Sequence, residues 1–152
     1  MSTAAAVGFA RDDALPWIEV WPGIELKVLR VVESEGLWVV RNRFAPGTSI
    51  ETHRHTGDVH GFTISGSWCY AEYSVDYPAG TYIYEPANSV HTLTVPERHR
   101  ESADVVFVMR GANLVLGNAG EVVRVDDGPT TLAFYRMMCE SRGLPPPPVL
   151  TG

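Results

Sequence analysis

The sequence predicts an all-β protein, a jelly-roll barrel that ends in one short helix. Eight or more short stretches between residues 24 and 125 are rich in β-branched or aromatic residues, or alternate between apolar and polar positions, and turn residues separate them. From residue 129 the apolar positions recur every three to four residues instead, which is typical of a helix. At 152 residues, the chain has the length of a single domain.

The N-terminal part of the chain contains an arm, an apolar segment and a hairpin. Residues 1–13 are mostly small or charged, and we expect them to form a flexible arm. Residues 17–22 include two tryptophans, so we expect this segment to cover the barrel or to meet a neighbouring subunit. Residues 24–28 and 37–44 are predicted as the two strands of a hairpin.

The rest of the chain is predicted to complete the barrel and then to form the helix. Further strands are expected at residues 59–65, 67–73, 80–85, 92–95, 103–109, 113–116 and 121–125. The helix is predicted over residues 129–143, with Asp127 as its N-cap and Gly143 at its end. Residues 1–152 would thus form one domain.

Charge and cysteine content narrow the class of protein. The net charge is −6 and the twelve lysines and arginines are scattered, which argues against a nucleic-acid-binding surface. No apolar run is long enough to cross a bilayer and no basic segment precedes the small residues at the start, so we expect no membrane partner and a cytoplasmic location. Cys69 and Cys139 lie seventy residues apart and are expected to be reduced thiols.

A cluster of histidines is the strongest indication of function. His53, His55 and His60 fall within eight residues of a chain that has five histidines, and His91 follows in the next block. Because side chains alternate along a strand, His53 and His55 point to the same side about 7 Å apart, close enough to bind one ion. Neutral imidazole suits iron, zinc, copper and nickel alike, so these residues indicate a transition metal without choosing one.

The spacing around these histidines forms two motifs. They run Gly47-x5-His53-x-His55-x4-His60-x5-Gly66 and Gly80-x5-Pro86-x4-His91. Together they resemble the two sequence motifs of the cupin superfamily, whose small barrels bind a divalent metal. This resemblance implies a cupin-type jelly-roll β-barrel with His53, His55 and His91 as metal ligands. The chain departs from the family pattern at His60, which stands where the first motif usually has a glutamate ligand.

A wider set of residues carries a second, narrower resemblance. These residues are Leu15-Pro16-Trp17, His53-Arg54-His55-Thr56-Gly57, His60, Gly66-x-Trp68-x-Tyr70-x-Glu72-Tyr73, Tyr84-Glu85-Pro86 and His91-Thr92-Leu93. Over nearly its whole length the chain resembles the 2,4'-dihydroxyacetophenone dioxygenase family, and more distantly the acetylacetone-cleaving dioxygenases. The resemblance implies an Fe(II) enzyme of aromatic compound degradation. Its partners would be dioxygen and a small hydroxy-ketone or diketone, which it would cleave at a carbon-carbon bond into two carboxylic acids.

Other residues near the predicted site are candidates for catalytic roles. His60 shares a strand face with Phe62. If that face points into the barrel, we expect His60 to be either a metal ligand or a hydrogen-bonded core residue. Glu85, six residues before His91, is expected either to orient a histidine through its free ring nitrogen or to form a salt bridge at the sheet edge. Glu72 is a candidate fourth ligand or hydrogen-bond partner.

Several side chains are candidates to contact the substrate in the predicted cavity. Arg41 or Arg43 is a candidate to neutralise an enolate, and the sequence does not choose between them. The aromatic residues Trp68, Tyr70 and Tyr84 are expected in the core or in a wall that suits an aryl substrate.

Two other functions fit the same residues. One is a non-catalytic cupin that senses a metal or small ligand, and the other is a metal-dependent isomerase or lyase with a different divalent transition metal. Oxygen consumption separates the dioxygenase from both. Small cupins of this kind usually assemble as dimers or tetramers, so the resemblance also implies a homo-oligomer. Residues 17–22 and the C-terminal helix are the expected contact surfaces.

Overall fold

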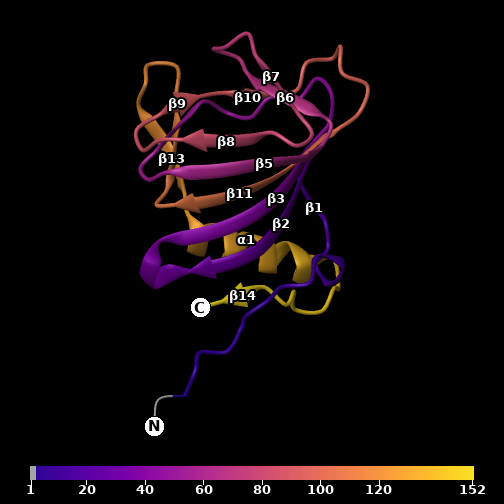
Figure 1. Cartoon of the computed structure of the whole chain (residues 1–152), viewed down its shortest axis with the longest axis vertical. Coiled ribbons are helices and arrows are strands. Elements are labelled where there is room, and N and C mark those ends of the chain that lie inside the picture. The colour runs from indigo at the N-terminus through magenta and orange to yellow at the C-terminus, as the bar shows by residue number, and fades with distance from the viewer. Residues whose placement is uncertain (1–2) are drawn as a thin grey trace.

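Residues 3–152, the part of the chain that this computed structural model describes, contain fourteen short strands in three sheets, one α-helix and two short 3-10 helices, Asp12–Ala14 and Glu33–Glu35 (Figure 1). The strands are β1 Ile18–Trp21, β2 Ile24–Val32, β3 Leu37–Phe44, β4 His53–His55, β5 Val59–Ser65, β6 Ser67–Tyr70, β7 Asp76–Pro78, β8 Tyr82–Glu85, β9 Val90–His91, β10 Leu93–Thr94, β11 Ala103–Arg110, β12 Asn113–Leu116, β13 Val122–Asp126 and β14 Leu150–Thr151. The helix α1 is Gly128–Ser141. The predicted all-β jelly roll with a short C-terminal helix is confirmed.

The three sheets enclose one cavity. The largest has seven strands, in the order β1-β2-β3-β11-β5-β8, with β14 added in parallel beside β2. The second sheet is β10-β6-β7 and the third is β13-β12-β4-β9. The cavity lies between the large sheet and the sheet that contains β4 and β9, since residues of both line it.

Individual strands differ from the predicted ones mainly at their ends. The first predicted strand continues to Val32, because apolar residues follow it without a turn residue. The strand predicted over residues 67–73 ends at Tyr70, and a turn follows. The segment at residues 17–22 includes a strand, β1, that pairs with β2.

The C-terminal helix begins and ends close to its predicted residues. The Asp127 side chain accepts a hydrogen bond from the Thr130 backbone N–H at 2.9 Å, which caps the helix as predicted. Gly143 follows the last turn with a φ of +67°, a left-handed conformation that glycine adopts without strain. Leu132, Tyr135 and Cys139 are buried along one stripe. Among residues 3–152, no helix is long and apolar enough to span a lipid bilayer.

The predicted N-terminal arm is attached to the barrel at its end. Residues 1 and 2 lie outside the described part of the chain, and residues 3–9 are exposed. Asp12, however, forms ion pairs with Lys27 and Arg41, each at 2.9 Å. The Trp17 ring lies 4.0 Å from the Arg43 guanidinium. This segment therefore covers the outer face of β2 and β3, which is the face turned away from the cavity.

Candidate metal centre

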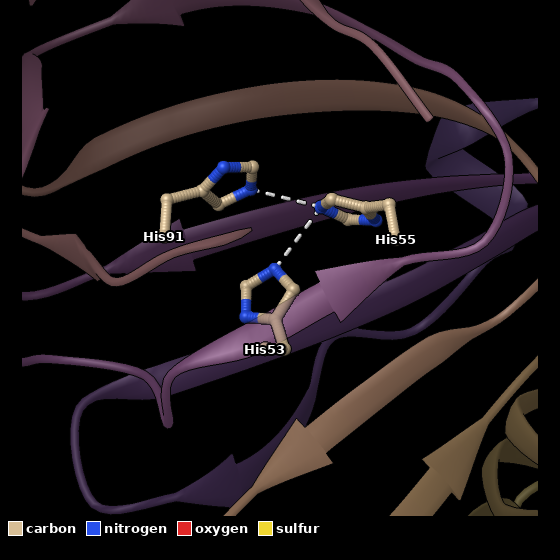
Figure 2. A group of neighbouring side chains, drawn as sticks. All are labelled: His53, His55 and His91. Atoms are coloured by element: carbon tan, nitrogen blue, oxygen red, sulfur yellow. Dashed lines mark hydrogen bonds between the residues drawn. The ribbon is translucent and has the colours of Figure 1, made fainter. Parts of the chain in front are cut away.

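Three histidines from two paired strands converge on one point. His53 and His55 belong to β4 and His91 to β9, and the ladder between these strands pairs His53 with His91. The Nε2 atom of His55 lies 3.1 Å from that of His53 and 2.9 Å from that of His91 (Figure 2). All three side chains are buried. Strand alternation brings the first two together, as predicted, and strand pairing adds the third.

Glu85 reaches the same point from the large sheet. It is the last residue of β8 and only 5% exposed. Its Oε2 atom lies 2.8 Å from Nε2 of His55 and 3.2 Å from Nε2 of His91. Its Oε1 atom accepts a hydrogen bond from the Tyr70 hydroxyl. Glu85 thus contacts two of the histidines, but through the ring nitrogens that face the centre, whereas the free ring nitrogen of a metal-bound histidine was expected.

The crowding of these atoms fits a bound cation. Nε2 of His55 has three polar neighbours within 3.1 Å, namely two imidazole nitrogens and the Glu85 carboxylate. One ring nitrogen cannot hydrogen-bond with all three. Ligand atoms about 2.1 Å from a single ion and at right angles to each other, by contrast, lie roughly 3.0 Å apart. Three imidazoles and a carboxylate are also a suitable donor set for a divalent transition metal.

Local hydrogen bonds and burial prepare these residues to bind a metal. Nδ1 of His53 lies 2.9 Å from the Glu51 carbonyl oxygen, and a hydrogen bond donated from Nδ1 leaves the lone pair of Nε2 facing the centre. Burial lowers the pKa of His53 to about 4, so this ring is neutral at pH 7, as a ligand must be.

The carboxylate of Glu85 is kept ionised by its neighbours. Burial alone would raise the pKa of Glu85, but the adjacent rings of His55 and His91 outweigh burial and hold the pKa below its usual range. Burial, followed by the charge of Glu85, raises the pKa of Tyr70, so the tyrosine keeps its proton and acts as the donor. Glu85 thus brings a negative charge to the centre.

A largely apolar cavity of about 910 Å³ adjoins the histidines. Its aromatic lining residues are Trp21, Trp38, Phe44, Phe107 and Phe134. Arg124, a half-exposed lining residue, forms ion pairs with Glu51 at 2.8 Å and with Asp126 at 3.0 Å. Among the described lining residues, Arg124 is the one arginine or lysine, and both its carboxylate partners lie at the cavity too.

The predicted aromatic wall is made by residues other than the predicted ones. Trp68 is fully buried in the core, where its indole N–H donates to the Thr63 hydroxyl at 2.8 Å. Tyr84 points away from the cavity and is 55% exposed. Tyr70 alone of the three expected residues contacts the centre, through Glu85. Sequence alternation along β3 and β11 identifies Trp38 and Phe107 as inward-facing, but not as cavity residues.

His60 is not part of the centre, contrary to our expectation. In β5 the buried positions are Val59, Gly61 and Thr63, so His60 points to the outer face. Its Nδ1 atom hydrogen-bonds with the Tyr82 hydroxyl. The prediction failed because the row that contains His60 is as apolar as the row that faces the core, and period alone cannot tell the two faces apart.

Glu72 and the two candidate arginines also lie outside the centre. Because β6 ends before Glu72, strand alternation no longer directs its side chain, which is exposed and accepts a hydrogen bond from the Thr92 backbone N–H at 3.1 Å. Arg41 binds Asp104 at 2.7 Å on the outer face of the sheet. Arg43 lies on that face too, and neither arginine lines the cavity.

The fold and the histidine centre together define a jelly-roll barrel of the cupin class. The chain belongs to the family of ChrR cupin-like domains, whose model matches residues 6–113, a range that includes His53, His55, Glu85 and His91. The predicted membership of the cupin superfamily is therefore confirmed. A sequence comparison with curated proteins gave no match.

Solved structures share this fold over nearly the whole chain. A protein of unknown function with a cupin-like fold from Ralstonia eutropha is 27% identical, with a TM-score of 0.87 over 100% of this chain and 96% of that one. An RmlC-like cupin from the same organism is 24% identical, with a TM-score of 0.86 over 93% and 92%. An acetylacetone dioxygenase from Acinetobacter johnsonii is 14% identical, with a TM-score of 0.76 over 91% and 95%. At this last identity the similarity shows the fold alone.

Proposed function

We propose that the protein is a non-haem Fe(II) dioxygenase that cleaves a carbon-carbon bond of an aryl hydroxy-ketone, of which 2,4'-dihydroxyacetophenone is the test compound. The observation that carries this proposal is the buried set of three imidazoles and one carboxylate beside an apolar cavity. The sequence resemblance to the dihydroxyacetophenone dioxygenases and the fold shared with an acetylacetone dioxygenase support it. Catalytic roles for His60 and Glu72 are not proposed, because both point away from the centre.

The proposed reaction balances without an added reductant. The bond between the carbonyl carbon and the hydroxymethyl carbon breaks, and each product receives one oxygen atom of dioxygen. The products are 4-hydroxybenzoic acid and formic acid. Ferrous iron, when bound, would activate dioxygen and offer open coordination positions, while the substrate supplies the electrons that reduce dioxygen.

His53, His55 and His91 would hold the iron, and Glu85 would complete the set. Ligands about 2.1 Å from an ion are roughly 3.0 Å apart in octahedral geometry and roughly 3.4 Å apart in tetrahedral geometry. The observed separations between Nε2 and the neighbouring donor atoms are 2.8, 2.9, 3.1 and 3.2 Å. Donor atoms this close together are compatible with one divalent ion held by these side chains.

The cavity would bind the organic part of the substrate. Its apolar and aromatic walls suit an aryl ring and exclude bulk water from the reacting groups. Because Arg124 is already paired with two carboxylates, the lining residues within 3–152 offer no free cationic side chain for a charged acid group. A neutral ketone is therefore a better fit than an anionic substrate.

Oxygen uptake tests this proposal directly. Protein purified without chelator is loaded with Fe(II) under nitrogen and mixed with 2,4'-dihydroxyacetophenone in air-saturated buffer. We expect one equivalent each of 4-hydroxybenzoate and formate per dioxygen consumed. The His91→Ala variant should be inactive, whereas the matched variant His99→Ala, which alters a loop histidine paired with Asp76, should keep full activity. Bound iron without oxygen uptake across hydroxy-ketones and diketones would contradict the proposal and favour a sensor or an isomerase.

A further inference from the structure

An apolar patch lies on the outer face of the large sheet, behind the metal centre. Four large side chains of β5 and β8 point outward there: Phe62, Ile64, Tyr82 and Tyr84, which are 49%, 41%, 60% and 55% exposed. The strand ladders place Phe62 beside Tyr82 and extend the same rows to Val106 and Val108 of β11. We call these six side chains and His60 between them the β5–β8 patch. In Figure 1 the strands that carry it lie side by side.

The two surfaces predicted for subunit contacts pack in part within the chain, although Trp21 and Met137 remain exposed. Trp17 packs against the Arg43 guanidinium, and its backbone carbonyl accepts a hydrogen bond from Arg142 at 3.1 Å. The apolar stripe of α1 is buried, and its Tyr135 hydroxyl donates to the Pro16 carbonyl at 2.6 Å. The β5–β8 patch has no such cover among residues 3–152.

We propose that the β5–β8 patch is the interface through which two copies of this chain pack face to face. Phenylalanine and tyrosine side chains can each bury about 150–250 Å², so the half-exposed members of the patch offer on the order of 400 Å². A stable interface buries about 800 Å² per partner, of which roughly 56–65% is apolar. The patch therefore supplies most of the apolar centre that a dimer of ordinary size needs.

Charge favours a second copy over a lipid surface. Membrane-binding faces combine apolar residues with a row of lysines or arginines, whereas this chain has a net charge of −6. Charges of both signs border the patch: Asp58 lies 3.4 Å from the His60 ring, and Arg41, which is opposite Val106 in the ladder with β3, is paired with Asp104. A face without clustered like charges can meet its own copy, as closed two-fold symmetry requires.

The proposed dimer is compatible with access to the metal centre. No member of the patch lines the cavity, because inward and outward side chains alternate along β5 and β8. Arg124, a lining residue whose side chain is 54% exposed, lies on the sheet formed by β13, β12, β4 and β9. Face-to-face packing of the large sheets through the patch would leave this side of the cavity uncovered.

Molar mass in solution tests the interface, by light scattering after size exclusion and by sedimentation equilibrium. We expect wild-type mass to be at least twice the 16.7 kDa of one chain, and Phe62→Lys to halve it. The control is Val123→Lys, because Val123 is an equally exposed strand valine at 56% outside the patch; its mass should equal that of the wild type. Circular dichroism confirms folding of each variant.

A second variant keeps the test decisive if Phe62→Lys does not fold. Tyr82→Ser removes an exposed ring from the edge strand β8 and should weaken dimerisation at least tenfold without loss of structure. A monomeric wild type at its highest soluble concentration, or folded patch variants that keep the wild-type mass, would overturn the proposal.

Discussion

Glu85 lies directly opposite Val59 in the antiparallel ladder between β5 and β8. Val59 faces the cavity close to where the first cupin motif usually has its glutamate ligand, and the neighbouring His60 faces outward. The carboxylate that the first motif lacks is thus present at the same end of the barrel, supplied by the adjacent strand. The three histidines come from the sheet that contains β4 and β9, and the glutamate comes from the large sheet, so the centre lies between these two sheets.

Removal of one histidine should abolish tight metal binding. For His91→Ala we expect the affinity for Co(II) or Fe(II), measured by calorimetry, to fall by more than about 100-fold, because loss of a mere hydrogen-bond partner of a ligand already costs 10–100-fold. His99→Ala is the matched control and should bind one ion per chain with unchanged affinity. Equal affinity of the two variants would show that the metal lies elsewhere.

Glu85 and Tyr70 should affect metal binding in graded fashion. Glu85→Gln keeps the shape of the side chain but removes the charge that lies 2.8 Å from His55, so we expect about 10–100-fold weaker Co(II) binding and an altered visible spectrum. Tyr70→Phe removes only the hydrogen bond that holds Glu85, and its effect should be in the same direction but smaller. Unchanged spectra in both variants would place Glu85 outside the metal site.

The outward direction of His60 leads to the opposite expectation. His60→Gln should leave metal affinity and oxygen uptake within twofold of the wild type, because the ring hydrogen-bonds with Tyr82 on the outer face. Glu72→Gln should behave in the same way, since this side chain contacts the Thr92 backbone. A loss of metal from either variant would mean that the register of β5 or the end of β6 differs from the one described.

Asp12 should make stability depend on pH. Burial alone would raise its pKa, but hydrogen bonds from Lys27 and Arg41 outweigh burial and lower it. A lowered carboxyl pKa stabilises the folded state above the unfolded pKa of about 3.9, and this contribution is lost as the pH falls through the folded pKa.

Thermal melts of Asp12→Asn measure this contribution. The variant should be less stable at pH 7 by about 1 kcal/mol or less, since a side chain that is 43% exposed is screened by solvent. The difference should shrink below about pH 4. Asp13→Asn is the control, because this carboxylate pairs only with the exposed Arg11 among the described residues. A deficit for Asp12→Asn that persists at low pH would contradict the assignment.

Local pattern predicted the barrel and the three histidines of the centre. Alternation along a strand was enough to place His53 and His55 on one face, and spacing within the second motif identified His91. The change from a period of two to a helical period located α1, with its cap at Asp127. Each of these features depends on residues that are close together in the sequence, so it can be predicted from the sequence alone.

The positions of Glu85 and His60 depend on contacts between distant segments. Only the register of β8 against β5 shows that Glu85 reaches the Nε2 side of the histidines. Likewise, His60 and Val59 differ by one residue along β5, and a shift of one residue exchanges the inner and outer faces. The outer face carries Phe62 and Ile64, and because these residues are apolar the face was predicted to point into the barrel. A partner surface on that face would explain why it resembles a core.

Anomalous diffraction from crystals of the iron-loaded protein tests the central claim most directly. At the iron absorption edge, we predict one peak per chain, bounded by the Nε2 atoms of His53, His55 and His91 and within bonding distance of Glu85. A chain that takes up no iron, or a peak away from these histidines, would contradict the account.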